Sequence, residues 1–597
     1  MGSSMGGASM GSSMGGASMG SSFLMQPTLL QRLGDQMQMQ SRKRKSNKNN
    51  PIENAYNLAL REELDSEIAR WWFSGGMCFT QARNPHYVRA FNFAASHDLS
   101  GYVPPGYNKL RTTLLQKEKV HERLLEPLKG TWKSKGVSIV CDGWSDAQRR
   151  PLINFIAINE GGPMFLKAIN CQGEFKDKHY ITHLIEEVIL EVGPMNVVQV
   201  ITDNAPVCKS AGLLIEARFP NVFWTPCVVH TLNLALRNIC AARNTIRNEV
   251  TYAECSWIVD IIDGGWFLKS FICNHSMRLS IFNDHATMKM LSYAETRFAS
   301  SIIMLQRLKD LKHGLQSMVV STKWASYRED DVVKAAQERD LILNEVWWDK
   351  VEYILEFTKP IYDMLRLADT DEPCLHLMYE MWDSMIEKVK RIIFRHEGRG
   401  VDETSSFYDV VHKILVDRWE KSNTPLHCLT HSLNPRRNVN VEFAKFSALL
   451  EDFGTSDSLR DRALMKPNIW WVVHGSSTPL LQNLALKLLG QPSSSSCAEK
   501  NWSTYSFIHS LKRNALTPQR AEDLVFVHSN LQGKNKMWDV GGDAFDTMEG
   551  VGLLEFANLS FEEPELEAVL FSDGNDILYN GGEGEGNSNE DEVLEVD

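Results

Sequence analysis

The apolar positions between residues 131 and 240 predict an α/β sheet. Five short apolar runs have the length of buried strands. They span residues 137–141, 152–158, 164–169, 197–202 and 222–224. The tight turn Gly161-Gly162-Pro163 indicates an antiparallel hairpin between the second and third runs. Apolar residues at helical spacing from Ile181 to Val192 predict an amphipathic helix that Gly193 and Pro194 terminate.

Helical periodicity dominates the segments on either side. An apolar stripe from Leu58 to Trp72 predicts a helix, a leucine stripe ends at Gly490, and Thr517-Pro518 opens another helix. We therefore expect six segments. They are 1–50 (low complexity, with a basic cluster), 51–130 (helical), 131–240 (first part of the core), 241–460 (helical insertion), 461–532 (helical, completing the core) and 533–597 (acidic tail).

Composition argues against a membrane protein and against a disulfide-rich secreted protein. The 597 residues are 43% hydrophobic, and no run of 18 apolar residues is present, so we expect no membrane partner. The 11 Cys include no C-x-x-C pair, which favours a reducing, intracellular compartment over a disulfide framework. Most of the net charge of −12 lies in residues 561–597, which hold no Lys or Arg, so the rest of the chain is near neutral. Nucleic acid remains a possible partner.

Both ends of the chain have the composition of disordered tails. MGSSMGGAS occurs twice at the N-terminus and begins a third time, and such a sequence cannot form a core. The acidic C-terminal tail carries scattered Leu and Phe. A basic cluster follows the first tail at Arg42, Lys43, Arg44 and Lys45. It predicts nuclear import, the alternative being a solvated linker.

Two carboxylates directly follow predicted strands: Asp142 in VSIVCDGWSD and Asp203 in VVQVITDNA. Rigid strands hold such side chains at the rim of a sheet, where neighbouring carboxylates can share Mg²⁺ or Mn²⁺. Two such ions support in-line phosphoryl transfer. Asp at a strand end is also a common turn former or helix N-cap. Asp146 fits the turn role better.

Several sequence blocks resemble those of plant hAT-superfamily transposases. In chain order they are CDGWSD, ITDNA, CVVHTLNLAL, ETRFAS, PLHCLTHSLNP with Trp470-Trp471, and SSSSCAEKNWSTYSFIHSLKRNALTPQRAEDLVFVHSNL. The resemblance implies an RNase H-like core interrupted by a long all-helical insertion, followed by a C-terminal dimerisation region. It also implies that Glu499 completes a catalytic, metal-binding triad with Asp142 and Asp203.

Each of these inferred roles has an alternative. Ser496-x-x-Glu499 is also a helix capping box. Cys227-x-x-His230 has the spacing of half a zinc site, but no convincing second half is present, so we identify no zinc site.

The family's DNA contacts map onto His230, Arg297 and Phe298, although Phe298 stands where the family has Trp. We find no BED-type zinc finger before residue 130. The missing finger weakens the expectation of sequence-specific DNA recognition, and Phe298 weakens that of hairpin-forming transposition chemistry.

Self-association is the remaining expectation. Leu484, Leu488, Trp502 and Tyr505 offer more apolar surface than a short helical region can bury, unless they pack on their own domain. The sequence therefore predicts a nuclear protein that dimerises and binds DNA. Three functions stay open: an active transposase, a domesticated relative acting in transcription or protein interaction, and, with less support, an RNase H-fold nuclease.

Overall fold

The computed structural model describes residues 51–77, 79–120, 126–146, 149–291, 298–327, 331–400, 402–424, 426, 437–508 and 516–532. The chain divides into two compact units, Met1–Leu99 and Ser100–Asp597. Each unit is described by itself. In the described residues, no helix is both long and apolar enough to cross a membrane.

The first unit contains a helical hairpin. Its helices are α2 (Pro51–Ser74) and α3 (Pro85–Ser96), with a 3-10 turn, η1 (Phe79–Arg83), between them. Trp72 is buried, and its ring meets that of Tyr87 edge-on with centroids 5.3 Å apart. Leu58 and Leu64 of the predicted stripe are exposed. The helical periodicity therefore predicted α2 correctly, but within residues 58–74, where burial is described, covered side chains lie only toward the C-terminal end.

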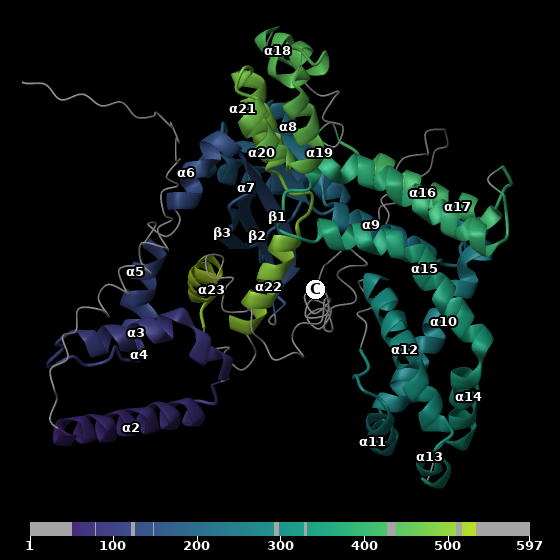
Figure 1. Ribbon diagram of the computed structural model, residues 1–597, viewed down its shortest axis with the longest axis horizontal. Helices are drawn as coiled ribbons and strands as arrows, with labels where there is room; N and C mark the ends of the chain where they lie inside the picture. The colour runs from purple at the N-terminus through teal and green to yellow at the C-terminus, as the bar shows by residue number, and fades with distance from the viewer. Residues whose placement is uncertain are drawn as a thin grey trace, which may run out of the picture. The chain divides into compact units, whose positions relative to one another are not determined.

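A five-stranded mixed sheet forms the centre of the second unit (Figure 1). Its strands are β1 (Val137–Ser145), β2 (Pro151–Asn159), β3 (Gly162–Asn170), β4 (Val197–Thr202) and β5 (Phe223–Pro226). The spatial order is β3-β2-β1-β4-β5, with β1, β2 and β3 antiparallel and both β4 and β5 parallel to the direction of β1. The predicted strands and the hairpin are confirmed.

One strand is longer than its apolar run. β1 continues past Cys141 to Ser145 because β2 pairs with it as far as Pro151. Asp142 therefore lies inside β1, opposite Asn154, and the expectation that it follows the strand is wrong. Pairing with β2 continues before and after Asp142 along β1, which fixes the carboxylate more firmly than a loop would.

Helices cover both faces of the sheet. They are α7 (Lys178–Val192), α8 (Pro206–Arg218) and α9 (Val228–Cys240). Residues of α7 and α8 share a core with alternate side chains of β1 and β2, such as Ile139 and Phe155. The intervening side chains, such as Val140 and Ile156, join a second core with α9. Gly193 ends α7 with φ 92°, a conformation that favours glycine.

A long helical segment follows α9 and shares the second core. Its helices are α10 (Glu249–Cys273), α11 (Ser276–His285), α12 (Phe298–Val319), α13 (Thr322–Ser326), α14 (Val332–Leu343), α15 (Glu345–Ala368), α16 (Met378–His396) and α17 (Ser406–Ser422), with 3-10 turns η4 (Ile246–Asn248) and η5 (Leu375–Leu377). Figure 1 shows α10 to α15 extending away from the strands.

The next helices build a small core of their own. They are α18 (Arg437–Ser447), α19 (Ser456–Leu464), α20 (Pro467–His474) and α21 (Pro479–Leu489), with the 3-10 turn η6 (Glu451–Gly454). Phe453, Trp470, Trp471 and Leu481 are buried together at its centre. Leu484 and Leu488 are half-buried on α21.

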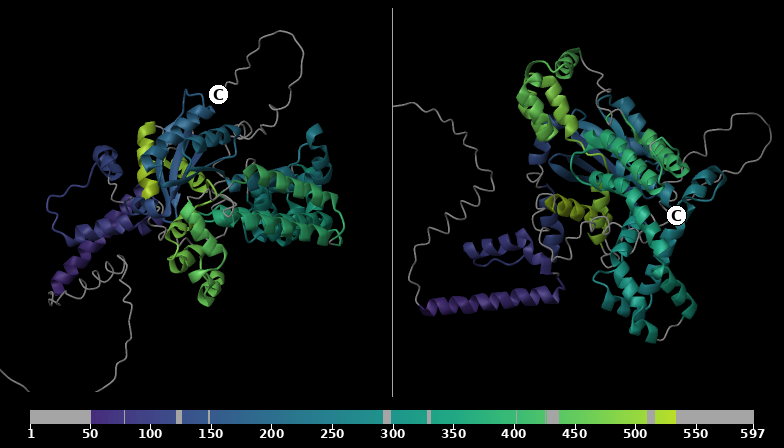
Figure 2. Two further views of the ribbon diagram at one scale, coloured as in Figure 1. Left: turned by 90° about the horizontal axis from the view of Figure 1, so that it is seen from above. Right: turned by 45° about the vertical axis from the view of Figure 1, so that its right-hand side comes forward.

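Two C-terminal helices return to the sheet, α22 (Ser496–Ile508) and α23 (Pro518–Gln532). Both views of Figure 2 place them, in yellow-green, against the strands. The side chain of Asn530 accepts a hydrogen bond from the N–H of Phe165 and donates one to its carbonyl, each at 3.0 Å. α23 thereby satisfies main-chain groups of the edge strand β3.

The burial of α22 corrects one expectation. Trp502 and Tyr505 are 4% and 2% exposed, because they pack against Trp144 of β1 in the same chain. These two side chains are not available as a surface for a second copy. Their apolar character serves the chain's own core.

The second unit also contains the helices directly before β1. They are α4 (Tyr107–Lys109), the π-helical turn η2 (Leu110–Leu114), α5 (Leu115–Val120) and α6 (Glu126–Lys135). Of these, α5 packs against α23 and α6 against α21. Lys119 of α5 forms an ion pair with Asp523 of α23, and Trp132 of α6 is buried in the sheet core.

A buried polar strap, Gln491–Ser496, joins α21 to α22. Gln491 accepts a hydrogen bond from Ser138 at 2.7 Å, and the carbonyl of Pro492 accepts one from Gln199 at 2.8 Å, so the strap is tied to β1 and β4. The Ser494 hydroxyl donates to the carbonyl of Ala368 at 2.7 Å, which ties it to the end of α15. The strap thus links the sheet, the helical segment and α22.

Removing one strap contact should measure its contribution. We expect Ser494→Ala to lower the free energy of unfolding by about 1–3 kcal/mol, because it leaves a buried carbonyl without its donor. Denaturant unfolding followed by circular dichroism measures this. Exposed Ser456 of α19 gives the matched control, Ser456→Ala, which should change little. An equally small loss in both variants would contradict the role of the strap.

Candidate functional site

The three predicted carboxylates meet at one edge of the sheet. Asp142 lies near the end of β1, and Asp203 follows β4, the parallel neighbour of β1, so both are at the same edge. Asp203 Oδ1 accepts a hydrogen bond from the N–H of Ala205 at 3.1 Å. Glu499 reaches this edge from the first turn of α22. The structure therefore brings together residues from opposite ends of the chain.

Two side chains that the sequence analysis did not place here fix α22 over Asp142. Trp502 Nε1 donates to Asp142 Oδ2 at 2.8 Å across 360 residues of sequence, and the Asn154 amide donates to the carbonyl of Ala498 at 2.9 Å. Trp502 is three residues after Glu499, on the same helix face. Asn154 is a polar residue inside an apolar strand. These two sequence features could have indicated that Trp502 and Asn154 lie at the carboxylate site.

Cys227 and His230 complete this corner. Cys227 is the N-cap of α9, and His230 lies in its first turn. His230 Nδ1 is 3.3 Å from Glu499 Oε1, and Cys227 Sγ accepts a hydrogen bond from the N–H of Ser495 at 3.3 Å. The nearest donor atoms of Cys227, His230 and Glu499 all lie within 4.8 Å of one another.

Burial and like charge shape the electrostatics of the site. Burial, followed by the charge of Glu499, raises the pKa of Asp142 to about 7, while His230 opposes this shift. Burial lowers the pKa of His230, but Glu499 and Cys227 outweigh it, so the pKa of His230 lies well above its ordinary value. Burial and the charges of Asp142 and Asp203 raise the pKa of the Cys141 thiol. The shifts show that the carboxylates of Asp142, Asp203 and Glu499 lie close enough to repel one another.

The other predicted residues have different positions. Asp146 accepts hydrogen bonds from the backbone and guanidinium of Arg150, so its turn role is confirmed. Phe298 begins α12, but its side chain and the whole of Arg297 lie outside the described residues. The basic cluster at 42–45 and both tails also lie outside them.

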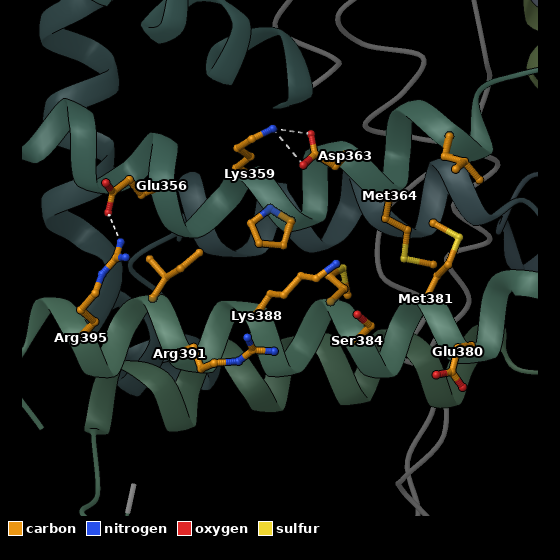
Figure 3. A pocket seen from close by; sticks show the side chains of 14 residues that line it. Glu356, Lys359, Asp363, Met364, Glu380, Met381, Ser384, Lys388, Arg391 and Arg395 are labelled. Atoms are coloured by element: carbon orange, nitrogen blue, oxygen red, sulfur yellow. Dashed lines mark hydrogen bonds and ion pairs between the residues drawn. The ribbon is translucent and has the colours of Figure 1, made fainter. Parts of the chain in front are cut away.

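A separate groove runs between α15 and α16 (Figure 3), with a volume of about 920 Å³. Lys359 pairs with Asp363 along its rim, and Arg395 pairs with Glu356. Met364 and Met381 line its apolar part. It holds none of the predicted site residues and has no bearing on the carboxylate site.

Two family models match separate segments of the chain. One is described as a domain of unknown function (DUF659) and matches residues 105–264; the other is the hAT family C-terminal dimerisation region and matches residues 449–531. Together they support a hAT-family transposase-like protein. The first match contains Asp142, Asp203 and His230, and the second contains Glu499.

A relative in Talaromyces stipitatus, tpeD, carries the name of a transcriptional regulator. It is 20% identical over 424 residues, which are 58% of this chain and 46% of the relative. The chain therefore spans about half the length of the relative it matches.

The raised pKa of Asp142 makes stability depend on pH. Its folded-state pKa of about 7 exceeds the ordinary 3.8, so its stabilising contribution is complete below the ordinary value and is lost as pH rises through 7. In chelator, the melting temperature of Asp142→Asn should therefore exceed that of the unaltered protein at about pH 8, and by clearly less at about pH 5. Asn keeps an acceptor for Trp502.

Thermal melts across this pH range measure the difference. Asp349→Asn, which changes an exposed carboxylate of α15, serves as the control and should give a difference independent of pH. A pH-independent difference for Asp142→Asn as well would contradict the electrostatic account.

Proposed function

We propose that this protein is a nuclear, DNA-binding hAT transposase-like protein whose Asp142, Asp203 and Glu499 hold a divalent metal for DNA strand cleavage. The observation that carries the proposal is the convergence of these carboxylates at one sheet edge, from two segments that separately match family models. Bringing three acidic side chains together where two of them are buried costs free energy, because the charged groups lose water and repel one another. A purely structural role gives no reason for this cost.

The strand arrangement supports an RNase H-like core. β1 to β3 form an antiparallel meander, and β4 and β5 extend the sheet in parallel beside β1. Asp142 lies on the central strand, and Asp203 follows its parallel neighbour. α22 then covers the same edge after the helical segment, as a core interrupted by an insertion requires.

The residues fit Mg²⁺ or Mn²⁺. Carboxylate oxygens are the ligands these ions prefer, and a cation would relieve the repulsion between Glu499 and the buried Asp142. When bound, such a metal activates a water or hydroxyl and stabilises the leaving oxygen of a phosphodiester. The chain's own residues hold the ligands in place: Trp502 orients Asp142, and His230 lies beside Glu499.

A non-cutting relative that acts in transcription is the second candidate. The name of tpeD favours it, and so does Phe298 in place of the family's Trp. A nuclease of the same fold has less support, because it would need no dimerisation region.

Replacing Asp203 separates cutting from binding. We expect Asp203→Asn to reduce Mg²⁺-dependent nicking of supercoiled DNA by about 100-fold or more, the scale on which loss of one transition-state contact acts. DNA binding should persist or tighten, because Asn keeps the shape of Asp without repelling phosphate. Gel assays of nicking and electrophoretic mobility measure the two properties.

The outcomes distinguish the candidates. Asp349→Asn is the matched control and should nick normally. Equal nicking by Asp203→Asn and the unaltered protein would refute the carboxylate site. DNA binding without any Mg²⁺- or Mn²⁺-dependent nicking by the unaltered protein would favour the transcriptional relative.

The match to the dimerisation region supports self-association, and we propose that α20 carries part of the contact. Ile469, Val472 and Val473 of this helix are exposed, the last two by more than half. The other side of α20 is occupied by Trp470 and Trp471 in the small core. An apolar outer face on a two-turn helix is typical of an interface.

Charge on this face should weaken self-association. We expect the pair Ile469→Asp and Val472→Asp to shift the molar mass measured by light scattering toward that of one chain, because a buried carboxylate opposes association. The pair Val332→Asp and Val333→Asp on α14 is the control, since both are 70% exposed outside the matched region. An unchanged mass for the α20 pair, with the fold intact by circular dichroism, would exclude this surface.

A further inference from the structure

Three side chains at the beginning of α9 and α22 form a donor set unlike the carboxylate triad. Cys227 offers a sulfur, His230 a ring nitrogen and Glu499 a carboxylate oxygen, all within 4.8 Å of one another. Cys227 is fully buried, and His230 and Glu499 are largely buried. Mg²⁺ prefers oxygen alone, whereas thiolate and imidazole select transition metals.

We propose that Cys227, His230 and Glu499 bind one Zn²⁺ ion and leave its fourth position open. Sites with three protein ligands from Cys, His and carboxylate, and water in the remaining position, are an established zinc arrangement. A closed structural site would need a fourth protein ligand. The proposal depends on these donors alone and not on DNA cleavage.

The local structure orients the sulfur of Cys227 and the ring nitrogen of His230 as zinc ligands. Cys227 and His230 are three residues apart at the start of one helix, so they face the same side. The N–H of Ser495 donates to Cys227 Sγ at 3.3 Å, an outer-shell contact of the kind that stabilises a thiolate ligand. Positive helix N-termini favour negative ligands at this point.

Glu499 connects this site with the carboxylate triad. Its Oε1 lies 3.3 Å from His230, and its charge also acts on Asp142. Glu499 is therefore a ligand of both the proposed zinc site and the proposed magnesium site. Asp203 is outside the zinc donor set, so a variant at Asp203 distinguishes the two sites.

Cobalt titration of the full chain, stripped of metal by a chelator, tests the proposal. We expect about one equivalent of Co²⁺ to produce tetrahedral visible bands and a sulfur-to-cobalt charge-transfer band, which Zn²⁺ then removes. Cys227→Ser should lose the charge-transfer band, and His230→Gln should weaken Co²⁺ binding by about 10-fold or more.

Two controls make the result specific. Cys240→Ser changes another buried thiol of α9, and Asp203→Asn changes the carboxylate triad alone; both should keep the charge-transfer band. Absence of the band in the unaltered protein overturns the proposal, as does its retention in Cys227→Ser. Unchanged Co²⁺ affinity in His230→Gln, folded by circular dichroism, overturns it as well. Failure of DNA nicking leaves these readouts unaffected.

Discussion

The buried polar strap Gln491–Ser496 is the constraint on which the candidate site depends. A polar segment inside a protein is stable only when its groups are hydrogen-bonded, so its register cannot slip without leaving several groups unpaired. Ser138 and Gln199 hold it to the sheet, and Ser494 holds it to α15. α22 begins where the strap ends. The position of Glu499 over Asp142 therefore follows from hydrogen bonds made up to eight residues earlier in the chain.

The carboxylate cluster itself destabilises the arrangement that the strap holds in place. Burial disfavours the ionised form of Asp142, and the charge of Glu499 disfavours it further. The fold offsets part of this cost locally, since Trp502 donates to Asp142 and His230 lies against Glu499. Both α9 and α22 also begin at this edge, so their N–H groups and dipoles face the negative charge. A site held together at such cost is typical of function rather than of stability.

The sequence predicted local structure well and long-range contacts poorly. Apolar runs identified the strands, and the Gly-Gly-Pro turn identified the hairpin, because both depend on neighbouring residues. Asp142 was placed after β1, since the pairing that extends this strand comes from β2. Trp502 and Tyr505 looked like interface residues, because apolar character alone does not tell which surface covers a side chain. Likewise, nothing local in the Ser-rich run 493–496 indicates that it is buried, because its partners are distant in sequence. Glu499 entered the candidate site only through the family resemblance.

The helix α9 explains why the site and the helical segment belong to one unit. Its first turn carries His230, and its body packs against α10, α12, α15 and α17 in a shared core. Within that first turn, Thr231 is hydrogen-bonded to Asn204, beside Asp203, and to Ser422 at the end of α17, each at 2.7 Å. Displacing α17 would break a buried hydrogen bond one residue from His230. The long segment between the two halves of the carboxylate site is therefore part of the support of that site. Its removal would expose the face of α9 that holds the corner of Cys227, His230 and Glu499 in place.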